Sequence, residues 1–549
     1  MPVSRLADAA RALVPLLRRA GWTAAGLREH LGEAATAALY RGEPAAVRRA
    51  VSDDSPLSFL TRLLVLREEV PWRRCAEALG EDLARALVSA EALERREDRA
   101  RMLIDVRPHV LAGVDRWVFS DADASMTSHV PGPDHVLGVG SASVSLMQSV
   151  PDSPVDTLLD LGTGSGVQAL AQFPLARRVV ATDVHPRALD FARATFAGAL
   201  ADPAGSPDAV PGVPGVPEVP EVEVAAGAWF EPVAGRRFDR IVSNPPFVVG
   251  PPAVGHVYRD SGLALDGASE LVLSQMPRHL NPGGTGHAVA AWVHREDQPW
   301  QARVASWLPS HGVRAWVLQR DVADPALYVG TWLRDESLDP RGPEADRRTR
   351  EWLDFFEREG VTGVGFGFVA LTRLGDDEPS EVVAEELTQE FSDPLGPEVE
   401  EYFLRAAWLA HAQGHGEILA CRFGLRPGVA RERVDVADAA TGMGFRPAVQ
   451  RLSRTDGPRF SHEVDEHIGA IVAGLHPEGL CLGEVVHLYC AARDLDAAEV
   501  GPQVSAAVVD LVRHGLLLPA DLLEGGSPLA PAEAAVSTRP AGADAEGAR

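Results

Sequence analysis

The sequence predicts an α/β protein in which a parallel sheet of seven strands lies between a helical N-terminal domain and an α-rich C-terminal domain. Its 549 residues are enough for about three domains, and 46% of them are hydrophobic, so a sizeable core is available. Apolar runs of strand length alternate with helical patterns over residues 151–375, as expected for a parallel sheet with helical crossovers. Apolar residues recur at helical spacing near both ends of the chain.

Residues 1–107 are predicted to form a helical, winged-helix-like domain. Leu6, Leu13 and Leu17 recur at helical spacing, and the polar–apolar alternation of residues 101–107 indicates a strand after the helices. Winged helices often bind nucleic acid, but many only mediate protein contacts, so a scaffold role stays equally open. Residues 108–150 contain further strand-like pieces and are expected to be a β-containing connector.

The central domain is predicted to span residues 151–375. Charged or Pro/Gly-rich stretches without periodicity at 202–220 and 322–344 are expected to be surface loops. The expected strands are 155–160, 178–182, 222–226, 238–243, 285–292, 313–320 and 362–373. The expected helices between them are 165–173, 186–199, 266–280, 298–309 and 345–358.

The rest of the chain forms a third region. Residues 376–525 start with an acidic stretch and end with helical patterns, which predicts an α-rich C-terminal domain. Residues 526–549 are rich in Ala, Gly, Pro and Glu and are predicted to be a disordered tail.

Charge and cysteine content restrict the function classes. The net charge is −26, and an acidic chain binds nucleic acid poorly without a local basic face. Residues 1–150 carry 19 Arg against 20 acids, so such a face remains possible there. Four Cys without metal-like spacing predict neither a metal site nor a disulfide framework. Without a signal-like or membrane-length apolar run, a cytoplasmic protein with no membrane contact is expected.

A glycine-rich turn, Asp160-Leu-Gly-Thr-Gly-Ser-Gly166, follows the first predicted strand. Glycines let the backbone turn sharply and approach a ligand closely. The dinucleotide-binding fingerprint, Gly-x-Gly-x-x-Gly, would need a third glycine where Val167 stands, so the turn does not match it. A plain tight turn without a ligand is another interpretation. Asp183 ends the second predicted strand, where a carboxylate can accept hydrogen bonds from two ribose hydroxyls or can cap the helix that follows.

The stretch Asn244-Pro-Pro-Phe247 follows the fourth predicted strand. The nitrogen of an amide or base amine is a poor nucleophile, because its lone pair is delocalised. The Asn244 side-chain oxygen and the Pro245 carbonyl could accept its two N–H groups and orient the lone pair. Pro245 and Pro246 stiffen the loop, and Phe247 offers a face on which a planar group can stack. A proline-stiffened loop without function is the alternative.

The glycine turn and the Asn-Pro-Pro-Phe motif together resemble class I S-adenosylmethionine-dependent methyltransferases, over residues 155–375. The resemblance implies a Rossmann-like, seven-stranded sheet whose last strand is antiparallel, with S-adenosylmethionine as the cofactor. Gly162 and Gly164 would then face the methionine and ribose parts of the cofactor, and Asp160 its amino group.

Further cofactor contacts follow from the same resemblance. Thr163 and Gly166 complete the glycine turn, and Asp183 would hold the ribose. Related enzymes often carry an acid after the third strand for the adenine ring, but this chain has Ala225-Ala-Gly-Ala-Trp-Phe230 there. Adenine contacts would therefore come from the backbone or from Trp229.

Two groups of enzymes within the family that this chain resembles differ in the substrate that accepts the methyl group. Phe as the fourth motif residue is frequent in enzymes that methylate guanine or adenine amino groups of ribosomal RNA, whereas Tyr is usual in HemK-like enzymes that methylate a glutamine of release factors. Leu263-Ala-Leu-Asp-Gly267 is faintly similar to the glutamine enzymes. We therefore predict an N-methyltransferase acting on an exocyclic base amine of RNA, with a protein glutamine as the alternative; its partners would be RNA or a protein of the translation machinery. An inactive scaffold and a dehydrogenase remain as alternatives from other classes.

Three secondary candidates remain. His411 and His415, with Glu417 nearby, have a zinc-compatible spacing, but a surface turn is favoured and no metal is expected. His256, Tyr258, Arg259 and Asp260 could line the acceptor site or could be solvated. Residues 134–140 could close over the cofactor or could merely connect two domains.

Overall fold

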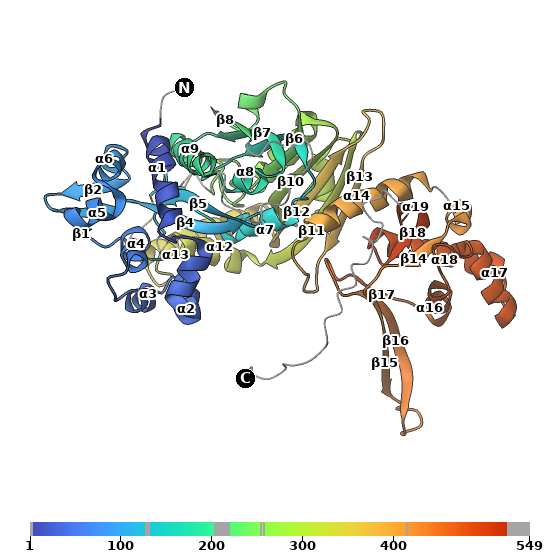
Figure 1. Ribbon diagram of the computed structural model, residues 1–549. Coiled ribbons are helices and arrows are strands. Elements are labelled where there is room, and N and C mark those ends of the chain that lie inside the picture. The colour runs from blue at the N-terminus through green and yellow to red at the C-terminus, as the bar shows by residue number, and fades with distance from the viewer. Residues whose placement is uncertain are drawn as a thin grey trace. The chain divides into compact units, whose positions relative to one another are not determined.

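The computed structural model describes residues 4–523, with gaps at 124, 127–131, 203–219, 253–254, 256–258, 337 and 413–414. The predicted disordered tail at 526–549 and most of the loop predicted at 202–220 lie outside the described residues. The chain divides into two compact units, residues 1–388 (unit 1) and 389–549 (unit 2) (Figure 1).

An eight-stranded sheet forms the centre of unit 1, in the order β13-β11-β12-β10-β9-β6-β7-β8 (Figure 1). Only β12 runs antiparallel to its neighbours, as predicted for the last strand of the central domain. The strands are β6 (Val155–Leu161), β7 (Ala176–Asp183), β8 (Glu221–Ala226), β9 (Phe238–Ser243), β10 (Leu280–His294), β11 (Val313–Ala323), β12 (Gly363–Arg373) and β13 (Glu381–Glu386). The predicted α/β class and Rossmann-like sheet are confirmed.

The prediction of seven strands is wrong by one. The eighth strand, β13, pairs in parallel with β11 and lies beyond the boundary predicted at residue 375. Its acidic side chains, which belong to the stretch predicted for the C-terminal domain, have partners on β11. Glu381 pairs with Arg314 at 2.9 Å, and the indole N–H of Trp316 donates to Glu385 at 2.8 Å.

Helices cover the sheet through buried clusters. One cluster joins the sheet residues Leu159, Ile241 and Ala290 to Trp300 and Val304. The covering helices are α8 (Val167–Gln172), α9 (Pro186–Ala201), α10 (Gly267–Gln275) and α11 (Trp300–Trp307), with 3-10 turns η1 (Glu231–Val233) and η2 (Met276–His279). These clusters fix the sheet whose carboxyl edge carries the candidate site.

Part of the loop predicted at 322–344 is a helix instead. The helix α12 (Pro325–Asp335) begins at Asp324, whose side chain accepts hydrogen bonds from the backbone N–H groups of Ala326 and Leu327. Pro325 occupies the first helical position, where its missing N–H costs nothing. The charged composition of residues 322–344 led to the prediction of a loop, so the helix cap at Asp324 was not recognised in the sequence. Together with α13 (Pro343–Arg358), α12 forms a helical pair between β11 and β12.

The second half of the N-terminal part runs helix, strand, helix, helix, strand, strand, which is the element order of a winged helix, and its strands form a small sheet in the order β1-β3-β2. The elements of the whole N-terminal part are α1 (Arg5–Arg19), α2 (Ala24–Tyr40), α3 (Pro44–Ala50), α4 (Pro56–Leu64), β1 (Val70–Pro71), α5 (Trp72–Leu79), α6 (Glu81–Ser89), β2 (Leu93–Arg96) and β3 (Arg99–Met102). Its core continues into α9 through Phe191 and Ala194. A hairpin of β4 (Ile104–Leu111) and β5 (Val114–Asp121) crosses the boundary predicted at residue 107, and α7 (Ser141–Ser149) follows.

Unit 2 combines helices with two small sheets, ordered β14-β18 and β15-β16-β17. Its elements are α14 (Gly396–His411), α15 (His415–Ala420), β14 (Phe423–Leu425), β15 (Val429–Ala437), β16 (Phe445–Arg454), β17 (Ser461–Glu463), α16 (Glu466–Ala473), α17 (Leu482–Arg493), α18 (Ala497–Arg513), β18 (Leu517–Pro519) and α19 (Ala520–Leu523). In neither unit does a described helix have the length and apolar character that a membrane crossing needs.

Candidate functional site

The candidate site lies at the carboxyl edge of the central sheet, where β6, β7, β8 and β9 end side by side. The glycine turn follows β6, Asp183 ends β7, Trp229 follows β8 and Asn244 follows β9. Because parallel strands bring their carboxyl ends to one edge, segments distant in sequence meet there.

The glycine turn is held open by the neighbouring strand. The backbone N–H groups of Gly162 and Thr163 donate to the Thr182 carbonyl at 2.9 and 2.8 Å. Gly162 and Gly164 have φ of +74° and +55°, which side chains rarely adopt. Apart from the adjoining residues, no atom of the part of the chain that the structure describes lies within 4 Å of the position that a Cβ would take at either glycine, so their exposed face is open to a ligand.

Gly166 allows close packing between helices and does not belong to the open face of the turn. A Cβ there would lie 2.8 Å from the Phe196 ring of α9, and its φ is +87°. Gly166 does not line the cavity described below, although it was predicted as a cofactor residue. Its role in the turn is to let α8 start close to α9.

Asp160 lies behind the glycine turn and does not line the cavity. Its fully buried carboxylate accepts hydrogen bonds from the Thr163 hydroxyl at 2.7 Å and from the Ala169 N–H at 3.0 Å. Burial raises the pKa of Asp160 to about 6. Its Oδ1 has no hydrogen-bond partner among the described residues. The contacts of Asp160 therefore shape the turn from within.

Asp183 joins the turn to the end of β7. Its Oδ2 accepts from the Gly164 N–H at 2.9 Å and its Oδ1 from the His185 N–H at 2.9 Å. Burial raises the pKa of Asp183, while these backbone donors act in the opposite direction. Each carboxylate oxygen keeps a second lone pair, and the side chain lines the cavity.

Residues 134–140, which could close over a cofactor or merely connect two domains, lie along the cavity. Two hydrogen bonds join Val136 to Asp121. The Val136 N–H donates to the Asp121 carboxylate at 2.9 Å, and the Val136 carbonyl accepts from the Asp121 N–H at 3.0 Å. His135, Val136 and Leu137 line the cavity, and so does Trp229. These residues form the walls beside the glycine turn.

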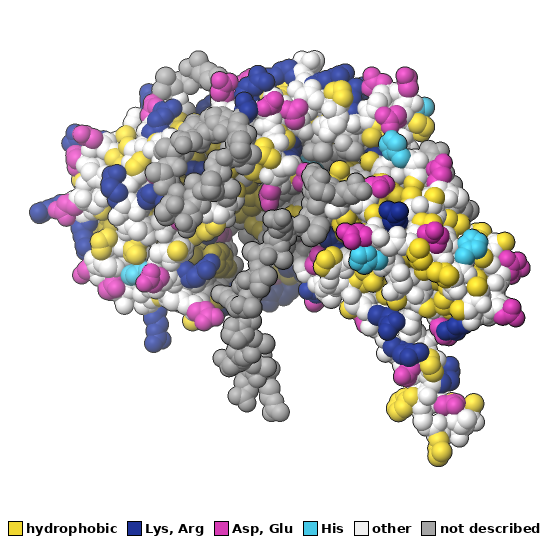
Figure 2. Space-filling model, turned by 45° about the vertical axis from the view of Figure 1, so that its right-hand side comes forward, with side chains coloured by type: hydrophobic (Ala, Val, Ile, Leu, Met, Phe, Trp, Pro, Cys, Tyr) yellow, Lys and Arg dark blue, Asp and Glu magenta, His cyan; other side chains and the backbone are white. Residues whose placement is uncertain are grey.

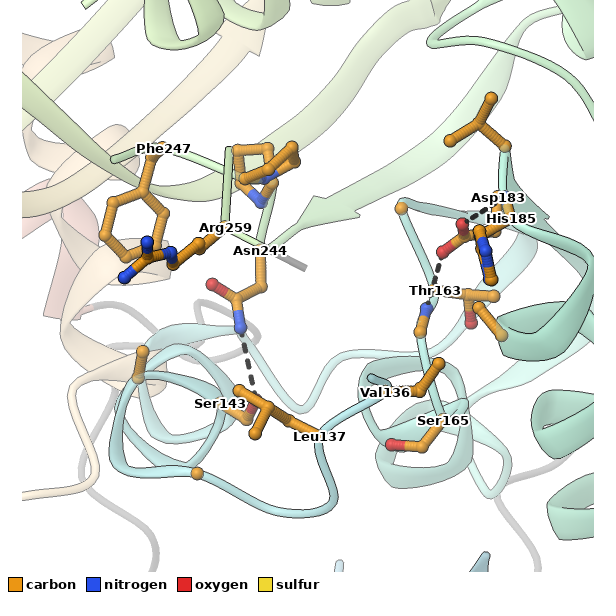
Figure 3. A pocket seen from close by; sticks show the side chains of 18 of the residues that line it. Val136, Leu137, Ser143, Thr163, Ser165, Asp183, His185, Asn244, Phe247 and Arg259 are labelled. Atoms are coloured by element: carbon orange, nitrogen blue, oxygen red, sulfur yellow. Dashed lines mark hydrogen bonds between the residues drawn. The ribbon is translucent and has the colours of Figure 1, made fainter. Parts of the chain in front are cut away.

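Asn244 is oriented by a residue on α7. The Asn244 Nδ2 donates to the Ser143 hydroxyl at 3.1 Å. Ser143 is itself held, because Gln168 donates to its carbonyl at 2.9 Å. The Asn244 Oδ1 has no hydrogen-bond partner among the described residues, and Figure 3 shows it turned to the side of Phe247 and Arg259. The carboxamide thus presents an acceptor to the cavity.

Two aromatic side chains stand at this end of the cavity. Phe247 packs on Phe366 with ring centroids 5.5 Å apart, and Trp332 of α12 lies beside the Arg259 guanidinium, 5.7 Å from its ring centroid. Phe247 and Trp332 both rest on one buried cluster that includes Val248. Both line the cavity, and both are only partly buried.

Arg259 is fixed by a buried ionic network. Its guanidinium binds the Glu336 carboxylate and the Trp332 carbonyl, and it lies 3.3 Å from Asp260. Arg348 binds the other side of Glu336. Because Arg259 is already engaged by carboxylates, it contributes little free positive charge to the cavity.

One cavity of about 760 Å³ connects these parts, a volume typical of small-molecule sites (Figure 3). Predicted residues that line it are Gly162, Thr163, Gly164, Asp183, Trp229, Asn244, Pro245, Pro246 and Phe247. Arg259 and Asp260 also line it, whereas His256 and Tyr258 lie outside the described residues. The glycine turn and the Asn-Pro-Pro-Phe loop thus open into a single space.

Several lining residues were missed from the sequence. Ser143, Gln168, Trp332 and Asp335 belong to segments without a motif. Only the helix cap at Asp324 could have revealed the helix that carries Trp332. No group of three metal-binding side chains occurs among the described residues, and the side chain of His415 is not described.

Two families of unknown function match the flanking parts of the chain. One, DUF7059, matches residues 19–103, and the other, DUF7782, matches residues 400–519. Neither includes the candidate site.

Curated relatives match part of the chain. Ribosomal RNA small subunit methyltransferase C of Salmonella choleraesuis (strain SC-B67) is 31% identical over 176 residues, which cover 32% of this chain and 42% of the relative. Release factor glutamine methyltransferase of Xylella fastidiosa (strain Temecula1 / ATCC 700964) is 36% identical over 142 residues, which cover 23% of this chain and 43% of the relative. The chain thus spans less than half the length of these relatives.

Solved structures give similar matches. The T. thermophilus 16S rRNA N2 methyltransferase RsmC, in complex with AdoMet and guanosine, has 17% identity and a TM-score of 0.24, over 48% of this chain and 65% of the other. An rRNA methylase from Streptococcus thermophilus has 12% identity and a TM-score of 0.22, over 42% and 94%. The sequence relatives confirm the resemblance that the two motifs predict: part of this chain is similar to RNA and protein methyltransferases of the S-adenosylmethionine-dependent kind.

Proposed function

We propose that this protein is an S-adenosylmethionine-dependent N-methyltransferase, and that its acceptor is a planar amino nitrogen, the exocyclic amine of a base in RNA. One observation carries the proposal: a single cavity is lined both by the open face of Gly162 and Gly164 and by the Asn244 carboxamide. A donor and an acceptor bound at its two ends would meet inside it.

The residues at the glycine end fit the cofactor. The bare faces of Gly162 and Gly164 admit a ligand against the backbone, and Asp183 offers lone pairs to two ribose hydroxyls. Trp229 lies after β8, where an adenine ring would be expected, and supplies an aromatic face in place of an acid. When bound, S-adenosylmethionine supplies a methyl group that is already activated by its sulfonium.

The residues at the other end fit a planar nitrogen. Asn244 Oδ1 and the Pro245 carbonyl would accept its two N–H groups and turn its lone pair toward the glycine end. Ser143 keeps the carboxamide in the orientation that presents oxygen rather than nitrogen. Phe247 and Trp332 offer aromatic walls for a planar ring. Alignment and fixed dipoles would supply most of the rate, and no strong base is required.

The polar groups at the acceptor end favour a base that donates hydrogen bonds. Asp260 and Asp335 line this part of the cavity, and the nearby cation, Arg259, is bound to carboxylates. The Asn244 Oδ1 and these carboxylates are hydrogen-bond acceptors. We therefore propose a guanine edge, which donates from its ring N–H and its amino group, over an adenine edge, which must accept at its ring nitrogen.

A protein glutamine is the second candidate, supported by the 36% identity to a release factor glutamine methyltransferase. One experiment separates the two. Extract from cells lacking this protein is incubated with the enzyme and a donor labelled in its methyl group, then treated with RNase or protease. Label lost with RNase supports the RNA proposal, and label lost with protease supports the glutamine.

Calorimetry tests the cofactor directly. Binding of S-adenosylmethionine with micromolar affinity is expected. Absence of binding would favour an inactive scaffold, and binding of a nicotinamide dinucleotide instead would favour a dehydrogenase.

A further inference from the structure

Unit 2 carries a long two-stranded ribbon, formed by β15, β16 and the turn between them (Figure 1). Residues 431–437 and 439–448 of the ribbon are exposed on both faces. Figure 2 shows charged side chains of both signs along it and hydrophobic side chains at its tip. A two-stranded ribbon without a packed face is only marginally stable in water. A surface of this kind is therefore expected to have a partner.

The outer edge of β15 is open among the described residues. The sheet order is β15-β16-β17, so β16 is the neighbour of β15 on one side and the structure describes no strand on the other. β15 itself is regular, because the extra residue of the bulge, Ala448, lies in β16. Nine residues of regular strand thus present unpaired backbone groups on one edge.

The sequence of β15, Val-Ala-Arg-Glu-Arg-Val-Asp-Val-Ala, is complementary to itself. Antiparallel pairing about a two-fold axis must place one residue opposite its own copy. A centre at Arg431, Glu432, Arg433 or Asp435 would oppose like charges. A centre at Val434 opposes two apolar side chains and places Arg433 of each copy opposite Asp435 of the other.

The charged residues are available for this pairing. Arg433 and Asp435 form no ion pair with any other residue that the structure describes. Val434 and Val436 are 40% and 38% exposed and lie on one face of β15, where Val434 would meet its own copy and Val436 would lie opposite Glu432 and diagonal to the second Val434. Pairing about Val434 therefore joins opposite charges and covers the exposed Val434 at the same time.

We propose that β15 is a self-association edge, and that two copies of this chain pair antiparallel through it with Val434 on the two-fold axis. Residue 437 of one copy then lies opposite residue 431 of the other. The exposed tip of each ribbon, with Met443 82% and Phe445 76% exposed, then points toward the base of the other ribbon. The occupant of this edge is a second copy, and the interface is small, so association is reversible at micromolar concentration.

Substitutions that reverse the charges on β15, made in the whole chain, test the proposal. Wild type should sediment as a mixture of monomer and dimer between roughly 1 and 100 μM, and Asp435→Arg should raise the dissociation constant at least about tenfold, because both Arg–Asp pairs become Arg–Arg. The double variant Arg433→Asp with Asp435→Arg restores the opposite charges and should restore the dimer. Asp82→Arg, the same charge change on the exposed face of α6, should leave association unchanged.

Hydrogen exchange of residues 429–437 provides a second measurement. The exchange rates of their backbone amides should fall as the protein concentration rises in wild type and in the double variant, but not in Asp435→Arg. A wild type that stays monomeric at about 100 μM would overturn the proposal, as would failure of the double variant to restore association. Slowing of these amides only on addition of RNA or another protein would also overturn it, because the partner would then not be a second copy.

Discussion

The hydrogen bond from Asn244 to Ser143 makes the proposed role of the Asn244 carboxamide testable. The substitution Ser143→Ala removes the acceptor that Asn244 Nδ2 reaches at 3.1 Å. Without the Ser143 hydroxyl, the Asn244 carboxamide can rotate so that its NH2 group faces the substrate. The NH2 group then lies against a substrate N–H group and cannot accept a hydrogen bond from it. A neutral hydrogen bond contributes about 1 kcal/mol, so kcat should fall about fivefold.

The assay measures initial rates of methyl transfer with both substrates saturating, together with the affinity for S-adenosylmethionine by calorimetry. Only kcat should change, because Ser143 acts on the acceptor side through Asn244. Ser145→Ala is the matched control: it removes a hydroxyl two residues along the same helix, where Ser145 contacts Arg320 at 3.1 Å. An unchanged kcat in Ser143→Ala, or an equal loss in Ser145→Ala, would refute the reasoning.

Three further predictions concern the same unit. Asn244→Ala should leave cofactor affinity nearly unchanged and lower kcat by about a hundredfold or more, since a preorganised dipole at the reacting nitrogen is lost; turnover within a few fold of wild type would end its assigned role. Trp332→Ala should raise the KM for the acceptor about tenfold, whereas Trp332→Phe retains most of the stacking; steady-state kinetics showing equal effects of the two would contradict a stacking role. Burial raises the pKa of Asp160 from 3.8 to about 6, so its proton stabilises the folded chain fully below pH 4 and that contribution is lost as the pH rises through 6. Between pH 4 and 7 the free energy of unfolding by urea should fall by about 2 kcal/mol more in wild type than in Asp160→Asn; parallel pH profiles would show that Asp160 is not the group responsible.

The sequence by itself determined what depends on short stretches of chain. Alternating strand and helix periods predicted seven strands of the sheet, because each period is read within about ten residues, whereas the antiparallel last strand followed from the family resemblance. The glycine turn and the prolines after Asn244 were readable for the same reason, since φ preferences belong to single residues. Parallel strands bring their ends to one edge, so even the meeting of Gly162 with Asn244 in one cavity followed from the order of the elements.

Tertiary structure decided which partners those segments meet. Ser143 and Asn244 are 101 residues apart, and nothing in either segment indicates that they form a hydrogen bond. Asp160 was predicted at the cofactor's amino group but lies buried behind the turn, because its partners are Thr163 and Ala169. The strand β13 was hidden by acidic side chains that are neutralised only across the sheet, and Trp332 reaches the cavity only because α12 folds over it. Local preferences fix the elements of a chain, whereas side-chain partners depend on packing between distant segments, which no short window of sequence contains.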